Sequence, residues 1–332
     1  MSKLHIIGMQ GLGDNIFQRP FIKALARQHE IILETAWPEL YSDLPLQFCN
    51  PNTRLRTQAK NVGRSRVSWV ARPVSNANRR ISYVNALRSG RSLISGMEEC
   101  FGIKLPGALD LPPLPASPVK ANKPIAFVRP IMLRREWFNS ARNPRPEYLA
   151  QLVDSLGTTH HIVTVADMLP DEEWFVGPPP KGDSEFLRGE LSAMQMLALM
   201  AACDIVIGGV GFIVPASIAL KRNCFVVYGG NGGYNAPDII ADPRLDRSRL
   251  GFATPENFCR CTNMRHDCNK TISDLSGQWQ TYWKRMVRDN SAILPGTTSA
   301  LVGFPSPPEQ DPTIRPISTD LPARPTAISA AP

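Results

Sequence analysis

The chain has 332 residues, of which 43% are hydrophobic, and it carries a formal net charge of +8 and seven cysteines. That length predicts two domains, and the apolar content is sufficient for packed cores. No apolar run approaches the roughly 18 residues of a membrane-spanning helix, and no leader-like segment opens the chain. We therefore expect a soluble, cytoplasmic protein. An odd number of cysteines in a chain this long argues against a secreted disulfide framework.

The first third of the sequence reads as one α/β unit. Strands are predicted at 4–7, 31–34 and 67–71, and helices at 16–28 and 92–100. A proline-rich segment at 111–118 follows, and its composition is typical of a semi-rigid linker.

The first predicted strand runs into a glycine-rich turn, G-M-Q-G-L-G-D-N, over residues 8–15. This places Asp14 at the carboxyl end of a strand, where open α/β sheets bind their ligands. Gly11 and Gly13 would let a substrate approach the backbone, and Asn15 follows at the start of a helix. We favour a catalytic or acceptor-side loop. A dinucleotide-binding turn, whose usual spacing is G-x-G-x-x-G, and a purely structural turn remain alternatives.

The positive charge is concentrated in the predicted first domain. Between Leu44 and Met97 there are ten Lys and Arg residues and no Asp or Glu. A field of one sign attracts a polyanion, such as nucleic acid, a phosphorylated glycolipid or an anionic membrane surface. A solvated basic face without a dedicated partner is the alternative. The candidate acceptor-binding residues are Gly11, Gly13, Asn15, Arg64, Arg66, Arg79 and Arg80.

The second part of the chain alternates strands and helices, which predicts a parallel sheet. Strands are expected at 125–128, 161–165, 205–207 and 224–228, and helices at 146–156, 193–202 and 214–220. A later helix, 276–289, gathers its aromatic residues on one face. The last 42 residues contain nine prolines and predict a disordered tail.

Two glycine-rich loops and a group of arginines predict a phosphate site in this second unit. Backbone N–H groups at a helix N-terminus can hold a diphosphate, and arginine forks match phosphate oxygens. Tight turns and a solvated basic loop are the alternatives. The candidate donor-binding residues are Arg134, Arg135, Arg142, Gly208, Gly209, Gly211, Phe212, Gly229, Gly230 and Asn231.

The pattern C-x-C-x4-H-x-C, formed by Cys259, Cys261, His266 and Cys268, offers zinc ligands, although reduced structural thiols are an alternative. No D-x-D pair occurs, which argues against a carboxylate-bound Mg²⁺ or Mn²⁺ at a nucleotide sugar. No G-x-S-x-G nucleophile motif occurs either. We therefore assign no catalytic metal and no cofactor.

Four segments resemble the family 9 glycosyltransferases, the superfamily of ADP-heptose:lipopolysaccharide heptosyltransferases. They are the opening glycine–acid loop with the helix after it, R-N-P-R-P-E-Y at 142–148, the strand–loop–helix–strand at 205–229, and the late cysteines. The chain departs from the family at its second glycine loop. Val210, Val214 and Pro215 stand where the family usually has an acid and one or two histidines.

The resemblance implies a GT-B architecture, in which two Rossmann-like domains with parallel sheets face each other. It implies an acceptor domain at 1–118, a nucleotide-sugar domain at 119–275, a helix at 276–290 that crosses back to the first domain, and a tail at 291–332. It also implies a metal-independent, inverting sugar transfer with Asp14 as the general base.

Our leading hypothesis is thus a glycosyltransferase that moves a sugar from a nucleotide diphosphate to a hydroxyl of an anionic acceptor. The acceptor would be a phosphorylated glycolipid or a modified DNA base, and a peripheral membrane contact would suit the former. The nucleotide sugar is a co-substrate. A catalytically inactive GT-B protein that binds nucleic acid or carbohydrate is the alternative, and a nicotinamide oxidoreductase ranks third.

Overall fold

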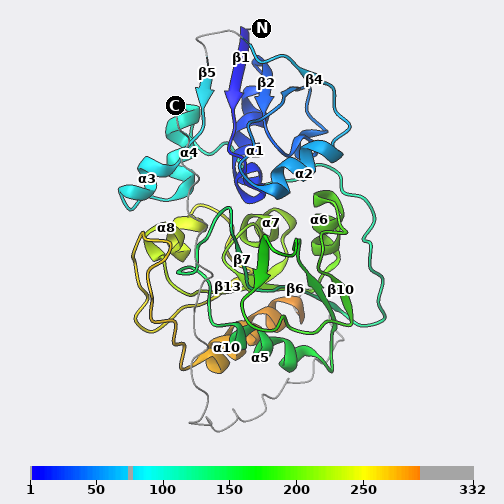
Figure 1. Ribbon diagram of the computed structural model, residues 1–332, viewed down its shortest axis with the longest axis vertical. Helices are drawn as coiled ribbons and strands as arrows, with labels where there is room; N and C mark the ends of the chain where they lie inside the picture. The colour runs from blue at the N-terminus through cyan, green and yellow to red at the C-terminus, as the bar shows by residue number, and fades with distance from the viewer. Residues whose placement is uncertain (1, 74–77, 292–332) are drawn as a thin grey trace, which may run out of the picture.

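The computed structural model describes residues 2–73 and 78–291, and it shows two lobes that each contain their own sheet (Figure 1). The first lobe lies at the top of Figure 1 and the second below it. Neighbouring strands are parallel throughout both main sheets, so the predicted α/β class and the GT-B arrangement of two parallel sheets are confirmed.

The first lobe has a five-stranded sheet in the order β4-β3-β2-β1-β5. Its core includes Ile6 from the sheet and Ile16 and Phe21 from the first helix, all fully buried. The elements are β1 Ser2–Ile7, α1 Leu12–Leu25, β2 His29–Glu34, η1 Pro38–Tyr41, β3 Gln47–Cys49, α2 Arg56–Arg64, β4 Trp69–Val70, β5 Asn78–Arg80, α3 Val84–Arg88 and α4 Leu93–Phe101.

The second lobe has a six-stranded sheet in the order β10-β8-β6-β11-β12-β13, and a small antiparallel pair, β7-β9, lies beside it. The elements are β6 Ile125–Arg129, β7 Met132–Arg134, α5 Pro146–Leu156, β8 His161–Val165, β9 Glu173–Phe175, β10 Ser184–Phe186, α6 Ala193–Ala202, β11 Ile205–Gly209, α7 Ile213–Leu220, β12 Asn223–Val227, α8 Gly232–Asn235, α9 Pro237–Ile240, β13 Leu250–Ala253 and α10 Leu275–Ser291.

Helix α10 packs on the second lobe, at the bottom of Figure 1 beside α5. Trp279 and Tyr282 are buried and contact the ring of Phe225 on β12. The predicted crossing of this helix to the first domain is therefore not observed among the described residues, because its aromatic face covers the second sheet. The predicted tail, apart from Ser291, lies outside the described residues.

Each main sheet reverses its strand order at one place. In the first sheet this switch point lies between β1 and β5, and in the second it lies between β6 and β11. Ligands of open α/β sheets bind outside the carboxyl ends of the strands at such points. Helix α1 begins beside the first and α7 beside the second, and the two helices pack against each other. The two switch points thus face one another across the boundary between the lobes (Figure 1).

None of the helices within residues 2–73 and 78–291 combines the length and the apolar character that crossing a bilayer requires.

Candidate functional site

Asp14 lies in the first turn of α1, not in the loop before it, because the helix starts at Leu12 and not at residue 16. Gly11 is the N-cap residue and has no side chain to accept the first free N–H groups of the helix. The carboxylate of Asp14, three positions later, turns back and accepts a hydrogen bond from the N–H of Gly11. Part of the role of this acid is therefore to cap the helix.

The second partner of Asp14 is Tyr83, whose hydroxyl donates a hydrogen bond of 2.9 Å to the carboxylate. Tyr83 follows β5, which lies beside β1, so both side chains meet at the first switch point. Burial raises the pKa of Asp14, against the hydrogen bonds from Tyr83 and Gly11 that lower it. The pKa of Tyr83 is also raised, by burial and by the charge of Asp14. A carboxylate with a raised pKa is a better proton acceptor at neutral pH.

Across the lobe boundary, the second switch point is cationic. Arg142 lies face-on to the ring of Trp137, with its guanidinium carbon 4.3 Å from the ring centroid. Its charge interacts with Tyr83 of the first lobe. Burial, together with the charge of Arg134, lowers the pKa of Arg142 to about 10. No hydrogen-bond acceptor contacts this guanidinium within the described residues, so its donors remain available for a phosphate.

Arg129 adds a second buried cation at the end of β6. Its guanidinium carbon lies 5.7 Å from the ring centroid of Phe212, and one nitrogen donates a 2.9 Å hydrogen bond to the carbonyl of Val165. Burial lowers its pKa to about 10 as well, with Arg134 contributing. Arg129 is not among the donor-binding residues that were predicted from the sequence.

The loop from Gly208 to Phe212 connects β11 to α7 at this switch point. A Cβ on Gly208 would lie 2.9 Å from the Cβ of Arg129, so this glycine is required for close packing, whereas a Cβ on Gly211 would meet open space. A Cβ on Gly13 would lie 3.0 Å from the Cα of Phe212 and 3.3 Å from the Cγ of Pro215. The two lobes are therefore in direct contact beside Asp14.

The glycine loop after β12, residues 229–233, is packed inside the second lobe and is largely closed to solvent. Gly229, Gly230 and Asn231 are buried. A Cβ on Gly229 would lie 2.1 Å from the carbonyl oxygen of Asn143, and one on Gly230 would lie 2.3 Å from the sulfur of Cys268. Asn231 adopts a left-handed conformation, with φ at 55°. Close packing accounts for these glycines, and a direct contact with a donor stays a prediction.

The remaining arginine candidates divide into bound and exposed side chains. Arg135 pairs with Glu172 at 3.7 Å on the surface, and Arg134 pairs with Glu173 at 3.5 Å. Arg64 donates to the carbonyl of Gly189 in the second lobe, and Arg79 donates to that of Phe101. Arg66 and Arg80 are exposed and have no ion-pair partner in the part of the chain that the structure describes.

A polar clamp between the lobes was missed by sequence reasoning. Arg56 on α2 pairs with Asp167 at 2.9 Å and with Glu173 at 2.6 Å, and Lys60 also pairs with Asp167. These acids belong to the second lobe. The basic segment therefore draws part of its counter-charge from the second domain, which the local composition does not reveal.

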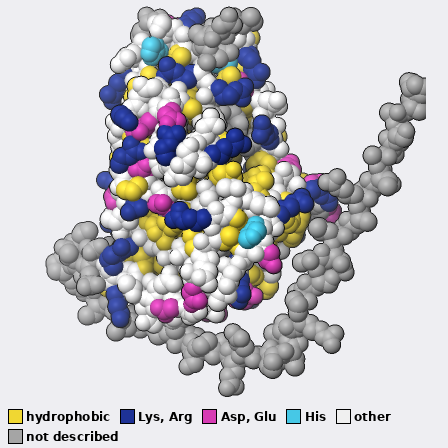
Figure 2. Space-filling model, turned by 90° about the vertical axis from the view of Figure 1, so that its left-hand side faces the viewer, with side chains coloured by type: hydrophobic (Ala, Val, Ile, Leu, Met, Phe, Trp, Pro, Cys, Tyr) yellow, Lys and Arg dark blue, Asp and Glu magenta, His cyan; other side chains and the backbone are white. Residues whose placement is uncertain are grey.

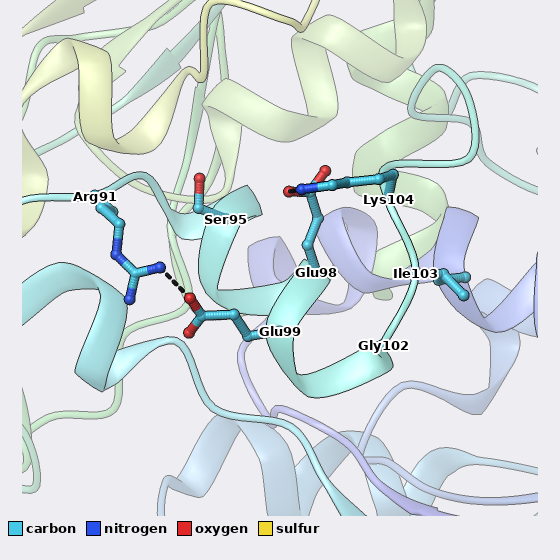
Figure 3. A pocket seen from close by; sticks show the side chains of 7 residues that line it. All are labelled: Arg91, Ser95, Glu98, Glu99, Gly102, Ile103 and Lys104. Carbon is cyan, nitrogen blue, oxygen red and sulfur yellow. Dashed lines mark hydrogen bonds and ion pairs between the residues drawn. The ribbon is translucent and has the colours of Figure 1, made fainter.

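A second tie joins the lobes at α4, where Arg244 pairs with Glu98 at 2.7 Å and Ser92 donates to Asp242. A surface hollow lies beside it, lined by residues of both charges, among them Arg91, Glu99 and Lys104 (Figure 3). Its cations are already paired with acids on the same helix, which makes it a poor site for an anionic ligand.

The cysteine cluster forms a compact group. The ligand atoms of Cys259, Cys261, His266 and Cys268 all lie within 4.8 Å of one another. The other four cysteines, Cys49, Cys100, Cys203 and Cys224, lie elsewhere.

The two facing parallel sheets, with their switch points opposed, define the fold of the two-lobed nucleotide-sugar glycosyltransferases. The chain is similar in structure to the iron-containing dodecameric glycosyltransferase TibC from enterotoxigenic E. coli, with a TM-score of 0.56, 12% identity, and coverage of 87% of this chain and 77% of TibC.

Two further solved structures share the fold. ADP-heptose lipopolysaccharide heptosyltransferase II of E. coli gives a TM-score of 0.50 at 15% identity over 87% of this chain and 100% of that one. A family 9 glycosyltransferase of Veillonella parvula gives 0.51 at 10% identity, over 86% and 97%. No protein-family model and no curated protein sequence matches the chain. At these identities the similarity establishes the fold, which agrees with the resemblance seen in the sequence.

Proposed function

We propose that the protein is a glycosyltransferase that moves a sugar from a nucleotide diphosphate to an acceptor hydroxyl, with inversion and without a catalytic metal. The observation that carries this proposal is the hydrogen bond of Asp14 with Tyr83 at one switch point, with Arg142 and Arg129 on the other side of the lobe boundary. Tyr83, the partner of an acid of raised pKa, interacts electrostatically with the partly buried Arg142 of the second lobe.

In the proposed reaction, the carboxylate of Asp14 takes the proton of the acceptor hydroxyl as its oxygen attacks the anomeric carbon. The bond from that carbon to the donor phosphate oxygen breaks, and its electron pair leaves with the nucleotide diphosphate. Arg142 and the N–H groups at the start of α7 would neutralise this charge. TibC has also been solved with ADP-D-β-D-heptose, so ADP-sugars are the first donors to test.

The first lobe offers fewer unpaired basic side chains for an anionic acceptor than its composition suggests. Six of the ten basic residues between Leu44 and Met97 have partners within the protein, and Arg54, Arg66, Arg80 and Arg88 have none among the described residues. On the face shown in Figure 2, Lys and Arg side chains are spread over the upper lobe. A phosphorylated glycolipid and a modified DNA base both stay candidates, and DNA predicts steep salt dependence of binding.

The test is nucleotide-dependent thermal stabilisation with a panel of ADP-, UDP- and GDP-sugars, since a ligand of the folded state raises its melting temperature. We expect a shift that Arg142→Gln reduces. Arg88→Gln, a matched change at an exposed arginine without an ion-pair partner among the described residues, should leave it intact. Asp14→Asn should keep the shift and lower turnover by about 10²–10⁴-fold.

A second function is favoured by one specific observation. The contact of Gly13 with Phe212 and Pro215, and the apolar Val210 and Val214 behind it, closes the place where polar donor contacts would be expected. A catalytically inactive protein that binds nucleic acid or carbohydrate through the same fold would show this packing. The absence of a thermal shift with every nucleotide sugar, together with retained binding of a nucleic acid or an oligosaccharide, would favour it.

A further inference from the structure

The segment that holds Cys259, Cys261, His266 and Cys268 has no helix or strand between residues 259 and 268. A ten-residue loop without regular structure needs another source of rigidity. The ring nitrogen Nδ1 of His266 lies 3.5 Å from the sulfur of Cys259 and 3.3 Å from that of Cys268, and the sulfurs of Cys261 and Cys268 are 3.6 Å apart. We call residues 259–268 the cysteine loop.

These separations match the edges of a tetrahedral metal site. Zinc binds thiolate sulfur at about 2.3 Å and imidazole nitrogen at about 2.0 Å, which gives ligand–ligand edges of about 3.8 Å for two sulfurs and about 3.5 Å for sulfur and nitrogen. A disulfide requires about 2.05 Å between its sulfurs, so Cys261 and Cys268 are not bonded to each other in this arrangement. All seven cysteines are free thiols.

The cysteine loop contacts the buried glycine loop at three polar points. The N–H of Gly232 donates to the carbonyl of Cys259 at 2.8 Å, and the N–H of Gly233 donates to that of Cys261 at 3.1 Å. The side chain of Asn231 donates to the carbonyl of Cys261 at 3.3 Å. Two of the four proposed ligand residues therefore hold the turn around Asn231 with their own backbone.

The same turn is joined to the loop that carries Arg142. The side chain of Asn139 donates to that of Asn231 at 3.4 Å, and the N–H of Gly229 donates to the carbonyl of Arg142 at 3.1 Å. The N–H of Ala141 donates to the carbonyl of Met264, inside the cysteine loop. Backbone hydrogen bonds thus connect the cysteine loop to the turn around Asn231 and to the loop of Arg142 (Figure 1, the yellow segments beside α8).

We propose that Cys259, Cys261, His266 and Cys268 bind one tetrahedral transition-metal ion, and that this ion fixes the turn around Asn231 and the loop of Arg142. Three thiolates and one imidazole select zinc, or iron as the other metal that such thiolate-rich sites accept. The role is structural, because all four tetrahedral positions are taken by side chains. The assignment of the metal does not depend on the proposed function, since it rests on the ligand set alone.

The first experiment is elemental analysis of the full-length protein purified without chelator. We expect about one equivalent of zinc or iron per chain, and the element found identifies the metal. Cys261→Ser and Cys268→Ser should lose it. Cys100→Ser, a matched change at a partly exposed cysteine outside the cluster, should retain it. Less than a tenth of an equivalent in the wild type, or equal loss in Cys100→Ser, would overturn the proposal.

Cobalt substitution keeps the proposal testable if a cysteine variant fails to fold. Wild-type protein stripped of metal should develop the visible ligand-field bands of tetrahedral Co²⁺ and its thiolate charge-transfer bands at one equivalent. His266→Ala, at an exposed position, should weaken or shift these bands. A spectrum of six-coordinate cobalt, or a Cys261–Cys268 disulfide found by mass spectrometry, would contradict the site.

The effect on the neighbouring loops is measured by hydrogen exchange. Chelation should speed exchange at the amides of Gly232, Gly233 and Ala141, whereas amides of β1 in the first lobe should not change. Unchanged exchange at those three amides would show that the ion, even if bound, does not order the turn. This readout and the metal content are independent of sugar transfer, so they separate failure of this proposal from failure of the proposed function.

Discussion

The hydrogen bond from Tyr83 to Asp14 makes a prediction about pH. Tyr83→Phe removes one hydroxyl and keeps the rest of the side chain. The hydroxyl stabilises the ionised carboxylate, so its removal should raise the pKa of Asp14 further. A hydrogen bond to a charged group is worth about 1.5–3 kcal/mol, and one pKa unit corresponds to about 1.4 kcal/mol. The expected rise is therefore about one to two pH units.

If Asp14 is the general base, it must be ionised to act, and kcat/KM falls on the acid side of its pKa. The acid limb of the pH–rate profile should then move to higher pH by about one to two units in Tyr83→Phe. The rate on the plateau should not fall, because a base of higher pKa is also a stronger base. Tyr228→Phe is the matched control, since the Tyr228 hydroxyl is buried in the second lobe and should leave the limb where it is.

If the acid limb of the pH–rate profile does not move in Tyr83→Phe, or moves to lower pH, this prediction is wrong. A fall of the plateau without a shift would instead indicate that Tyr83 contacts the acceptor. The same shift can be sought without activity, in the pH dependence of unfolding, where Tyr83→Phe should move the interval over which Asp14 titrates.

Three other predictions concern stability and are checked by urea unfolding. Burial raises the pKa of Asp14, so the free energy of unfolding of the wild type falls as the pH rises from 3.8 to the pKa of the folded state. Asp14→Asn should remove this fall, so the stability of the variant relative to the wild type should grow from pH 3.8 and then level off. A stability difference that is the same at every pH would contradict this prediction. Tyr228→Phe removes a buried hydroxyl that has no hydrogen-bond partner in the described structure, so it should raise the free energy of unfolding by about 1 kcal/mol. A decrease would indicate that a bound water pairs with this hydroxyl. Arg56→Met leaves Asp167 and the buried Glu173 short of a cation and should cost about 3 kcal/mol, while Arg54→Met, at an exposed arginine, should cost nothing measurable.

Much of the second lobe could be predicted because its helices carry local signals. The predicted bounds of α5 and α6 agree with the structure. Pro146 occupies the first turn of α5, and Ser192 with Gln195 forms a capping box before α6. Helix α1 was placed four residues late because its N-cap, Gly11, gives no such signal, and Asp14 supplies the missing acceptor from inside the helix.

The contacts that build the site could not be read from the sequence. Tyr83 meets Asp14, which lies 69 positions earlier, only because β5 pairs with β1, and β5 is a three-residue strand with no periodic pattern of its own. The sequence analysis did not identify Tyr83 as a partner of the acid. Likewise, the acids that neutralise Arg56 and Lys60 lie more than a hundred residues away.

The choice between an enzyme and an inactive binding protein depends on how much folding free energy an ionisable residue at position 14 costs. A residue that only capped α1 could be Asn or Ser, both of which accept hydrogen bonds while neutral. Asp14 is an ionisable group in a part-buried place that raises its pKa, so ionising it in the native state costs free energy. Proteins accept such a cost mainly where chemistry uses the group. The tight contact of Gly13 with Phe212 favours an inactive binding protein only if the two lobes cannot separate. They are held by polar clamps at their edges and by two helix contacts, α1 with α7 and α3 with α8. Buried apolar residues of both lobes, among them Leu12 and Val214, belong to one cluster, so opening would expose apolar surface. The raised pKa of Asp14 therefore weighs toward catalysis, whereas a donor would have to part the closed contact at Gly13.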